Sequence, residues 1–158
     1  MKNLFIIFFF IFMGKTHAQT FESMKFDDIK LQYDEKDDTL YVVNFWATWC
    51  KPCIEELPFF ENCHQKYKEN KVKIILVNLD FNSKFDLLVI PFIQKRKMES
   101  KVIHLTDTDS NTWINKVDSA WSGAIPATVL IKNGNTTFFK EGTVTQTELE
   151  EKINIQLK

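Results

Sequence analysis

The sequence predicts an α/β domain in which helices flank both faces of a central mixed sheet. Two short runs rich in β-branched and aromatic residues, 41–47 and 72–79, have the composition of buried strands. Between them, apolar residues recur at helical spacing over 54–68. This strand, helix, strand order is a βαβ unit, which implies parallel pairing with a right-handed connection. Farther on, the turn residues 133–135 close a hairpin of antiparallel strands, so the sheet is mixed.

The other elements follow from the same patterns. A second amphipathic helix is predicted over 85–93, where Pro91 either interrupts the helix or begins a separate one. The remaining predicted elements are a strand at 101–105, a short helix at 113–117, the hairpin strands at 127–131 and 136–140, and a C-terminal helix at 145–156.

Two stretches are less regular. Pro58 lies inside the first helical pattern, where it removes a backbone hydrogen bond and is expected to kink the helix. The segment 20–39 has the weakest pattern, and within it residues 26–33 are interpreted as an edge strand or hairpin, followed by a charged loop at 35–38.

The size and charge of the chain limit its function. With 158 residues, it is long enough for one domain with its own core and too short to favour two. A formal net charge of −1 gives no electrostatic reason for binding to nucleic acid. We therefore expect a monomer whose partner is not selected by charge.

The first residues have the layout of a signal peptide. Lys2 provides a basic start, residues 4–13 form an uninterrupted apolar run, and a small, polar exit follows as far as Ala18. The apolar run is about half the ~20 residues that a membrane-spanning helix needs, which disfavours a permanent anchor without excluding an uncleaved one. We expect residues 1–18 to be a signal peptide and 19–158 to be one exported domain in the periplasm or another extracytoplasmic space. There a pair of cysteines is able to cycle between thiols and a disulfide.

Cys50 and Cys53 are the candidate reactive residues. Cys50 stands where a strand ends and a helix begins, so unpaired backbone N–H groups and the positive end of the helix dipole favour its thiolate. Lys51 adds a positive charge, and Pro52 has a preset φ that suits the first helical turn. The spacing places the second sulfur one turn farther on, where it can attack a mixed disulfide. Cys50 is thus predicted to be the attacking thiol and Cys53 the resolving thiol.

A metal site is the main structural alternative for such a pair. Cys50, Cys53, Cys63 and His64 would supply four zinc-type ligands. However, the helix between Cys53 and Cys63 is about 15 Å long at 1.5 Å per residue, which is too long for one tetrahedral site. We therefore predict no metal and no cofactor beyond the redox-active disulfide. Cys63 is interpreted as a buried small hydrophobe, and His64 and His104 are given no ligand role.

The run 44–53, Asn-Phe-Trp-Ala-Thr-Trp-Cys-Lys-Pro-Cys, followed by Glu56 and Pro58, resembles the active-site signature of the TlpA/ResA branch of thioredoxin-like proteins. Downstream, residues 123–128 resemble the loop that carries the cis-proline of this family. The distance between the two motifs exceeds that in a minimal thioredoxin. The resemblance covers roughly residue 39 to the C-terminus and implies a thioredoxin fold, with an extra helix and strand inserted before the cis-proline loop.

The resemblance also implies which residues contact a substrate. A cis bond at Ile125–Pro126 is plausible because proline lowers its cost, and it would turn the backbone of Ile125 towards the cysteines, where an extended peptide can pair with it. Trp49 is expected to flank Cys50 as an apolar wall, while Trp46 packs in the core. Trp121 either faces the active site or packs in the core, and the sequence does not decide between these alternatives.

Glu56 is the candidate proton acceptor. Thioredoxin has a buried Asp where this chain has Asn44, so another base is needed. Glu56 follows Cys53 by three residues on the same helical face and matches the Glu of this branch. If Glu56 is buried beside thiols, its pKa rises, since desolvation disfavours a carboxylate. The alternative is a solvated helix residue, which is the interpretation given to Glu55.

The resemblance implies an exported thiol–disulfide oxidoreductase acting on protein disulfides and dithiols, and we expect a reductase supplied with electrons by a membrane thiol carrier. Two other functions of the same fold are weighed against it. A thiol peroxidase normally has a Thr-x-x-Cys setting, which Trp49-Cys50 replaces here. A copper-binding module would use Cys-x-x-x-Cys and a downstream His, and this spacing is one residue short.

Overall fold

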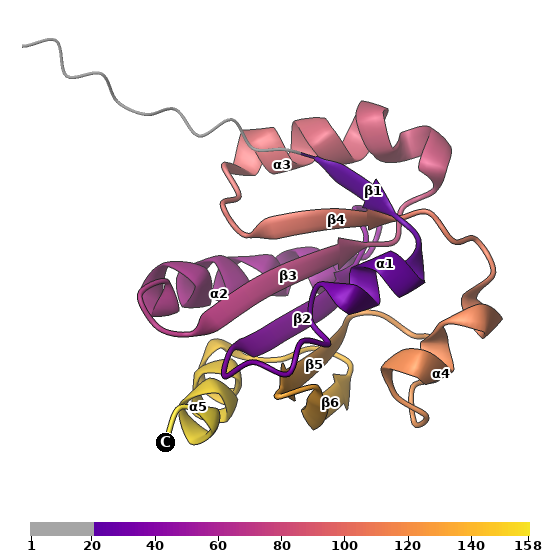
Figure 1. The fold of residues 1–158 in the computed structure, drawn as a ribbon. Helices are drawn as coiled ribbons and strands as arrows, with labels where there is room; N and C mark the ends of the chain where they lie inside the picture. The colour runs from indigo at the N-terminus through magenta and orange to yellow at the C-terminus, as the bar shows by residue number, and fades with distance from the viewer. Residues whose placement is uncertain (1–20) are drawn as a thin grey trace, which may run out of the picture.

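The computed structural model describes residues 21–158, so the expected signal peptide lies outside the described residues. Figure 1 shows the course of the chain. The elements in chain order are β1 (Glu22–Met24), α1 (Phe26–Leu31), β2 (Leu40–Trp46), α2 (Lys51–Tyr67), β3 (Val72–Asn78), η1 (Asn82–Lys84), η2 (Phe85–Val89), α3 (Ile90–Arg96), β4 (Lys101–Leu105), η3 (Ser110–Thr112), α4 (Ile114–Val117), β5 (Ala127–Lys132), β6 (Asn135–Glu141) and α5 (Gln146–Gln156).

The strands form one mixed sheet in the order β1-β4-β3-β2-β5-β6. β2, β3, β4 and β1 are parallel, while β5 is antiparallel to β2 and to β6. β2 lies in the middle of the sheet and is buried along its whole length. The βαβ unit and the hairpin predicted from the sequence are confirmed. Between them the chain adds α3 and β4, the extra helix and strand that the resemblance implied.

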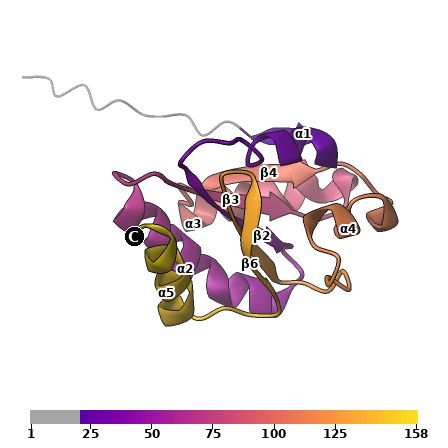
Figure 2. The same cartoon turned by 60° about the horizontal axis from the view of Figure 1, so that its bottom comes forward.

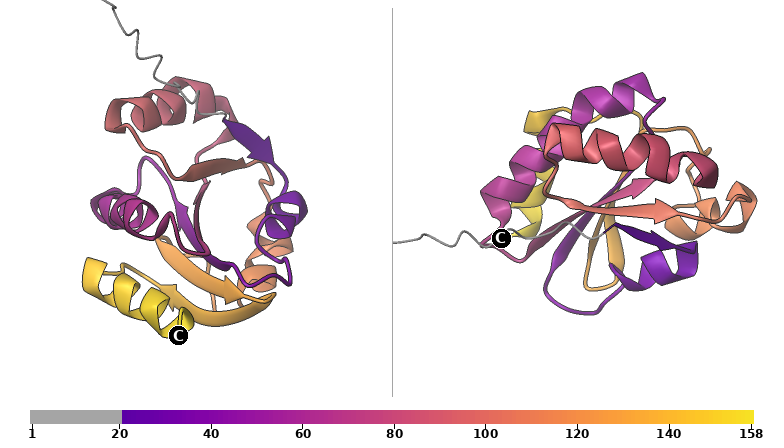
Figure 3. Two further views of the ribbon diagram at one scale, coloured as in Figure 1. Left: turned by 60° about the vertical axis from the view of Figure 1, so that its left-hand side comes forward. Right: turned by 90° about the horizontal axis from the view of Figure 1, so that it is seen from above.

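Helices cover both faces of the sheet. On one face, α2, α3 and α5 pack over a core that includes Leu57, Ile93 and Leu149. On the other face, α1 and α4 pack over a second core that includes Phe26 and Val117. The left view of Figure 3 shows these two helical layers with the sheet between them. Among the described helices, none combines the length and the apolar composition needed to cross a bilayer.

The prediction of a strand or hairpin over 26–33 is wrong. These residues form α1, because Phe26 and Ile29 are spaced by three and both point into the core from one helical face. The edge strand is the three residues before them, β1, which pairs with β4. A three-residue strand has too few positions for its alternation to be recognised in the sequence.

The helical regions accommodate Pro58 and Pro91. α2 runs from Lys51 to Tyr67 as one helix with Pro58 inside it. Pro91 begins a separate helix, which is one of the two predicted alternatives: η2 is a π-helical turn, and Pro91 stands in the first turn of α3. The change from π-helical to α-helical hydrogen bonding thus falls at the proline, which has no N–H group to donate.

Candidate active site

The two cysteines lie where the central strand meets α2. β2 ends at Trp46, and Cys50 is the N-cap residue of α2. Cys50 and Cys53 are joined by a disulfide. The Cys50 Sγ accepts a hydrogen bond of 3.3 Å from the backbone N–H of Cys53, one of the groups that the start of a helix leaves unpaired. Cys50 is 5% exposed and Cys53 is 0% exposed, so the Cys50 sulfur is the one that a partner reaches first.

The loop before β5 faces the disulfide. Its Ile125–Pro126 peptide bond is cis, and the carbonyl oxygen of Ile125 lies 3.7 Å from the Cys50 Sγ. Trp121 supports this loop, because its indole N–H donates a hydrogen bond of 2.8 Å to the backbone carbonyl of Ala124. Trp121 is itself buried against Phe45 and Trp113. Trp121 therefore packs in the core, as one of its two alternatives had it, and is bonded to the loop that faces the disulfide.

Glu56 is buried in the first turns of α2, three residues after Cys53. Its Oε1 accepts a hydrogen bond of 2.8 Å from the side-chain amide of Asn44, on β2. Its Oε2 accepts one of 2.8 Å from the backbone N–H of Val144, in the segment between β6 and α5. That segment passes beside α2 (Figure 2). The solvated position considered for Glu56 is therefore wrong, while Glu55 is exposed as expected.

The burial of Glu56 changes its acidity. Desolvation raises the pKa of Glu56 to about 7, because the carboxylate loses most of its hydration. The hydrogen bonds from Val144 and Asn44 oppose this rise, and so does the positive charge of Lys140. A carboxyl group with a pKa near neutrality both accepts and releases a proton under ordinary conditions. It lies three residues from Cys53 on the same helix.

Asn44 connects the carboxyl group to the proline loop. Besides Glu56, its amide donates to the hydroxyl of Thr128 at 3.0 Å, two residues after Pro126. The Asn44 side-chain oxygen is buried and has no hydrogen-bond partner within the described part of the chain. The site therefore joins α2, β2 and the start of β5 through one buried amide.

Sequence comparison identifies the family. The Redoxin family model matches residues 15–155, which is most of the chain. The chain belongs to the redoxin family. It is 32% identical over 133 residues to the thiol-disulfide oxidoreductase ResA of Oceanobacillus iheyensis, a match that covers 84% of this chain and 65% of that protein. It is also 30% identical over 121 residues to the thioredoxin-like protein YneN of Bacillus subtilis, covering 72% and 63% of the two chains. The redoxin thus spans somewhat less than two thirds of the length of these relatives.

Solved structures resemble this redoxin in fold. The crystal structure of StoA from Bacillus subtilis aligns with a TM-score of 0.58 and 28% identity, covering 74% of this chain and 84% of that one. A putative thiol:disulfide interchange protein DsbE from Chlorobium tepidum aligns with a TM-score of 0.63 and 24% identity, covering 78% and 83%. The fold is thioredoxin-like, and the relatives agree with the TlpA/ResA-like branch that the sequence motifs predicted.

The two tryptophans of the motif have different positions in this redoxin. Trp46 is fully buried, as predicted. Trp49 is 64% exposed directly before Cys50, and Phe81, which follows Asp80, is 75% exposed. Asp80, which precedes Phe81, accepts a hydrogen bond from the backbone N–H of Thr48, which precedes Trp49. The two exposed rings thus follow residues that are in contact with each other. Two exposed aromatic side chains therefore lie close to the loop that carries Cys50.

Sequence reasoning missed a buried polar cluster at the same end of the sheet. Asp80 is buried and accepts hydrogen bonds from the N–H and the hydroxyl of Thr48, at 2.7 and 2.5 Å. Asn78 donates to Asp80 at 2.8 Å, and His104 on β4 lies against Asn78. The available signal was Asn78-Leu79-Asp80, polar residues at the carboxyl end of a strand that is parallel to the strand leading to the cysteines.

Cys63 and His64 take no part in this site. Cys63 is fully buried, and burial raises the pKa of its thiol to about 11. The side-chain amide of Gln146 lies 3.7 Å from its sulfur. Among residues 21–158, no three His, Cys, Asp or Glu side chains are grouped closely enough to hold a metal ion.

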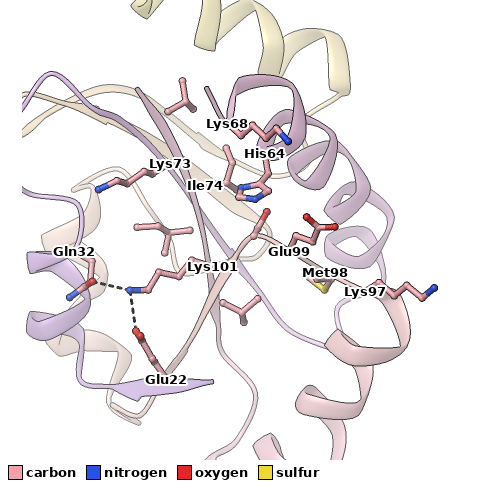
Figure 4. A pocket seen from close by; sticks show the side chains of 14 residues that line it. Glu22, Gln32, His64, Lys68, Lys73, Ile74, Lys97, Met98, Glu99 and Lys101 are labelled. Atoms are coloured by element: carbon pink, nitrogen blue, oxygen red, sulfur yellow. Dashed lines mark hydrogen bonds and ion pairs between the residues drawn. The ribbon is translucent and has the colours of Figure 1, made fainter. Parts of the chain in front are cut away.

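A groove of about 970 Å³ lies at the other end of the sheet, where β3 and β4 begin. Lys68, Lys73, Lys97 and Lys101 line it together with Glu22 and Glu99. Figure 4 shows Lys101 bound to both Gln32 and Glu22, at 3.0 Å each. Because the cysteines follow the carboxyl end of β2, which is parallel to β3, this groove is remote from the disulfide.

Proposed function

We propose that this redoxin is an exported thiol–disulfide oxidoreductase that reduces disulfides of protein substrates through Cys50 and Cys53. The observation that carries the proposal is the arrangement of Cys50. Its sulfur caps α2, is the more accessible of the pair and lies 3.7 Å from the carbonyl oxygen of Ile125. The ResA relatives are named as thiol-disulfide oxidoreductases, which supports the same reaction class.

The reaction begins with both cysteines reduced. The Cys50 thiolate attacks one sulfur of a substrate disulfide, a mixed disulfide forms, and the other substrate sulfur leaves as a thiolate. The helix N-terminus stabilises the attacking thiolate through the Cys53 N–H that points at it. The Cys53 thiolate then attacks the Cys50 sulfur and releases the second substrate thiolate. Two electrons have passed to the substrate, and the enzyme holds the Cys50–Cys53 disulfide.

Glu56 accepts the proton that Cys53 loses before this second attack. The resolving thiol is fully buried, so no solvent molecule reaches it readily to take the proton. Glu56 has a pKa of about 7 and lies one helical turn away. When the next reductant converts the disulfide back to thiols, the protonated carboxyl group returns its proton.

The substrate pairs with the proline loop. The backbone of Ile125 offers its carbonyl oxygen beside the Cys50 sulfur, and an extended substrate segment adds to it by main-chain hydrogen bonding. Trp49 supplies an exposed apolar contact on the other side of Cys50. Because main-chain pairing makes few demands on side chains, substrates of varied sequence are accommodated.

The location follows from the N-terminal residues. The basic start and apolar run of residues 1–18 direct export, and the disulfide chemistry then takes place outside the cytoplasm. A reductase in such a space needs a continuing supply of electrons. A membrane thiol carrier fills that need by reducing the Cys50–Cys53 disulfide after each turnover.

Reduction of insulin by the purified domain, with dithiothreitol as the electron source, tests the proposal. Cys50→Ser is expected to abolish exchange, and Cys53→Ser to stop it at the mixed disulfide. Cys63→Ser is the matched control, because this cysteine is buried away from the pair and is expected to leave the rate unchanged. Full activity in Cys50→Ser would show that the nucleophile is another group.

The direction of electron flow is tested by a redox titration of the Cys50–Cys53 pair. A reductase is expected to have a potential near thioredoxin's, about −270 mV, whereas an oxidase would approach that of DsbA, about −120 mV. A potential near that of DsbA would contradict the proposed role as a reductase, but it would leave the assignment of disulfide exchange to this pair intact.

A further inference from the structure

A chain of buried hydrogen bonds connects β4 to the loop that holds Cys50. It consists of His104 on β4, Asn78 at the end of β3, Asp80 just after it, and Thr48, two residues before Cys50. His104, Asn78 and Asp80 are each less than 5% exposed. Buried polar groups of this kind are costly unless each has a partner, so the directions of their hydrogen bonds are strongly constrained.

The orientation of Asn78 is fixed by Asp80. The Asn78 amide nitrogen lies 2.8 Å from the Asp80 carboxylate, which only accepts. The Asn78 side-chain oxygen lies 3.2 Å from the backbone N–H of Asp80, which only donates. The group that Asn78 presents to His104 Nδ1, at 3.2 Å, is therefore its oxygen. His104 must donate from Nδ1.

Asn82, which is exposed, contacts the other side of the ring. Its amide nitrogen donates to the backbone carbonyl of Thr106 at 3.2 Å. Its oxygen then lies 2.9 Å from His104 Nε2. Both ring nitrogens of His104 face acceptors, and only the imidazolium ion donates from both. The hydrogen-bond pattern is that of a positively charged His104.

The surroundings of the ring balance this charge. Burial lowers the pKa of His104 below its ordinary value, while the carboxylates of Asp80 and Asp86, on the segment after β3 and on η2, act in the opposite direction. β1 on the other side pairs the uncharged Ser23 with His104, and Phe85 stacks on the ring at 4.3 Å between centroids. The imidazolium thus forms on acidification and compensates the buried Asp80 carboxylate.

We propose that His104 is a positioning residue whose positive charge, when the ring is protonated, stabilises the buried carboxylate of Asp80, so that the loop carrying Cys50 is fixed more firmly when His104 is charged. Asp80 transmits the effect because it holds Thr48 by both its N–H and its hydroxyl. When His104 is neutral, Nδ1 keeps its proton and its bond to Asn78, Nε2 faces the Asn82 oxygen without a proton between them, and Asp80 loses its nearby positive charge. The reactivity of Cys50 then follows the protonation of His104 as well as its own.

This inference rests on the proposed role of Cys50 as the attacking thiol, and it is tested without any substrate. The reduced protein is treated with iodoacetamide, and the alkylation rate of Cys50 is followed by mass spectrometry of its peptide from pH 4.5 to 9. The alkylation rate of the wild-type protein is expected to show a second pH-dependent change on the acid side of neutrality, in addition to the rise that thiolate formation causes. The size of this step is about fivefold, the factor that one ordinary hydrogen bond contributes.

Two variants isolate the step. His104→Gln is expected to remove it and keep the thiolate rise. Thr48→Val deletes the hydroxyl bond to Asp80 and is expected to reduce the step while His104 still titrates. His64→Gln is the matched control and is expected to keep the wild-type profile. A step that survives in His104→Gln, or is missing from wild type, would overturn the proposal.

A measurement on the unaltered protein protects the test against variants that fold poorly. The ring nitrogens of His104 are observed by long-range ¹H–¹⁵N NMR as the pH is lowered. Both are expected to become protonated while the protein stays folded, and a neutral ring throughout the folded range would refute the inference. If these results hold but insulin is not reduced, the proposed function fails and the coupling stands. If insulin is reduced and the acid-side change in alkylation rate is absent, the proposed function stands and the coupling to His104 fails.

Discussion

Glu56 provides a quantitative prediction, because its environment links the stability of the fold to pH. Glu56→Gln replaces the buried carboxyl group by a neutral group of the same shape. The pKa of Glu56 is raised from an ordinary value of 4.5 to about 7, mainly by burial. This difference corresponds to about 3 kcal/mol, at roughly 1.4 kcal/mol for each pKa unit.

The sign follows from which state binds the proton more tightly. Below pH 4.5 the carboxyl group is protonated in both folded and unfolded chains, and its ionisation costs nothing on folding. As the pH rises to about 7 the unfolded chain releases the proton first, so the wild-type free energy of unfolding falls. The glutamine variant has no such loss. Its advantage over wild type is expected to grow by up to about 3 kcal/mol between pH 4.5 and 8.

The structure has room for the amide. The N–H of Val144 donates to the side-chain oxygen of the glutamine as it does to the carboxylate. The glutamine nitrogen, however, needs an acceptor at the position where Asn44 donates to the carboxylate. Turning the Asn44 amide supplies that acceptor and lets the Thr128 hydroxyl donate to it, at the expense of the long 3.4 Å contact between the Asn44 nitrogen and the Ala127 carbonyl. The substitution is therefore expected to change the pH dependence without disrupting the site.

Urea denaturation of the oxidised proteins at several pH values between 4.5 and 8 measures the effect. Glu55→Gln is the control, since Glu55 is the exposed neighbour on the same helix and its substitution is expected to give a difference that is flat with pH. If the difference between Glu56→Gln and wild type also stays flat, the carboxyl group does not titrate as the burial implies. The proposed proton acceptor would then need to be sought elsewhere.

Three further substitutions test the supports of the site. Gly123→Ala is expected to destabilise the fold by about 2 kcal/mol, because φ is +94° and the added Cβ would lie 2.8 Å from the Ile114 side chain; Gly142→Ala, also at positive φ but in open space, should cost less by thermal denaturation. Thr145→Ala removes the side-chain cap of α5 on the Glu148 N–H, and the urea midpoint should fall by the equivalent of about 1 kcal/mol. Trp121→Phe removes the indole bond to Ala124, which is expected to cost about 1–3 kcal/mol and to slow insulin reduction as the proline loop loses its support; an unchanged rate would separate the loop from the core beneath it.

The sequence predicted the parts of this protein in which one pattern dominates. The apolar strands β2 and β3, the helical spacing of α2 and the turn at Asn133-Gly134 each give a strong local signal, and all appear at the predicted places. The reactive pair was predictable because Cys-x-x-Cys at a strand-to-helix junction carries its chemistry in its spacing. Where the signal was short, as in β1, or fitted two structures, as in α1, the choice depended on tertiary packing and was missed.

The candidate site was predictable only in part, for a related reason. Glu56 was identifiable from its spacing to Cys53, but its burial depends on Val144, which lies 88 positions away in the chain. The His104 cluster joins residues from the loop after β2, the end of β3 and β4, and no local pattern reveals which polar side chains will share one end of a sheet. Trp121 illustrates the same limit, since a tryptophan before the proline loop is compatible both with facing the active site and with packing in the core.

The Cys50 sulfur is both the proposed nucleophile and the cap of α2, and this double role makes the helix a sensor of the chemistry. The Cys50 sulfur accepts a hydrogen bond from the Cys53 N–H, and the hydrogen exchange of this single amide can be measured. A thiolate at Cys50 is a stronger acceptor than a disulfide sulfur, so this amide is expected to exchange more slowly in the reduced protein. A bulky group attached to Cys50 would draw the sulfur away and loosen the first turn. The redox state of the protein is therefore expected to be reported by the stability of one helix end.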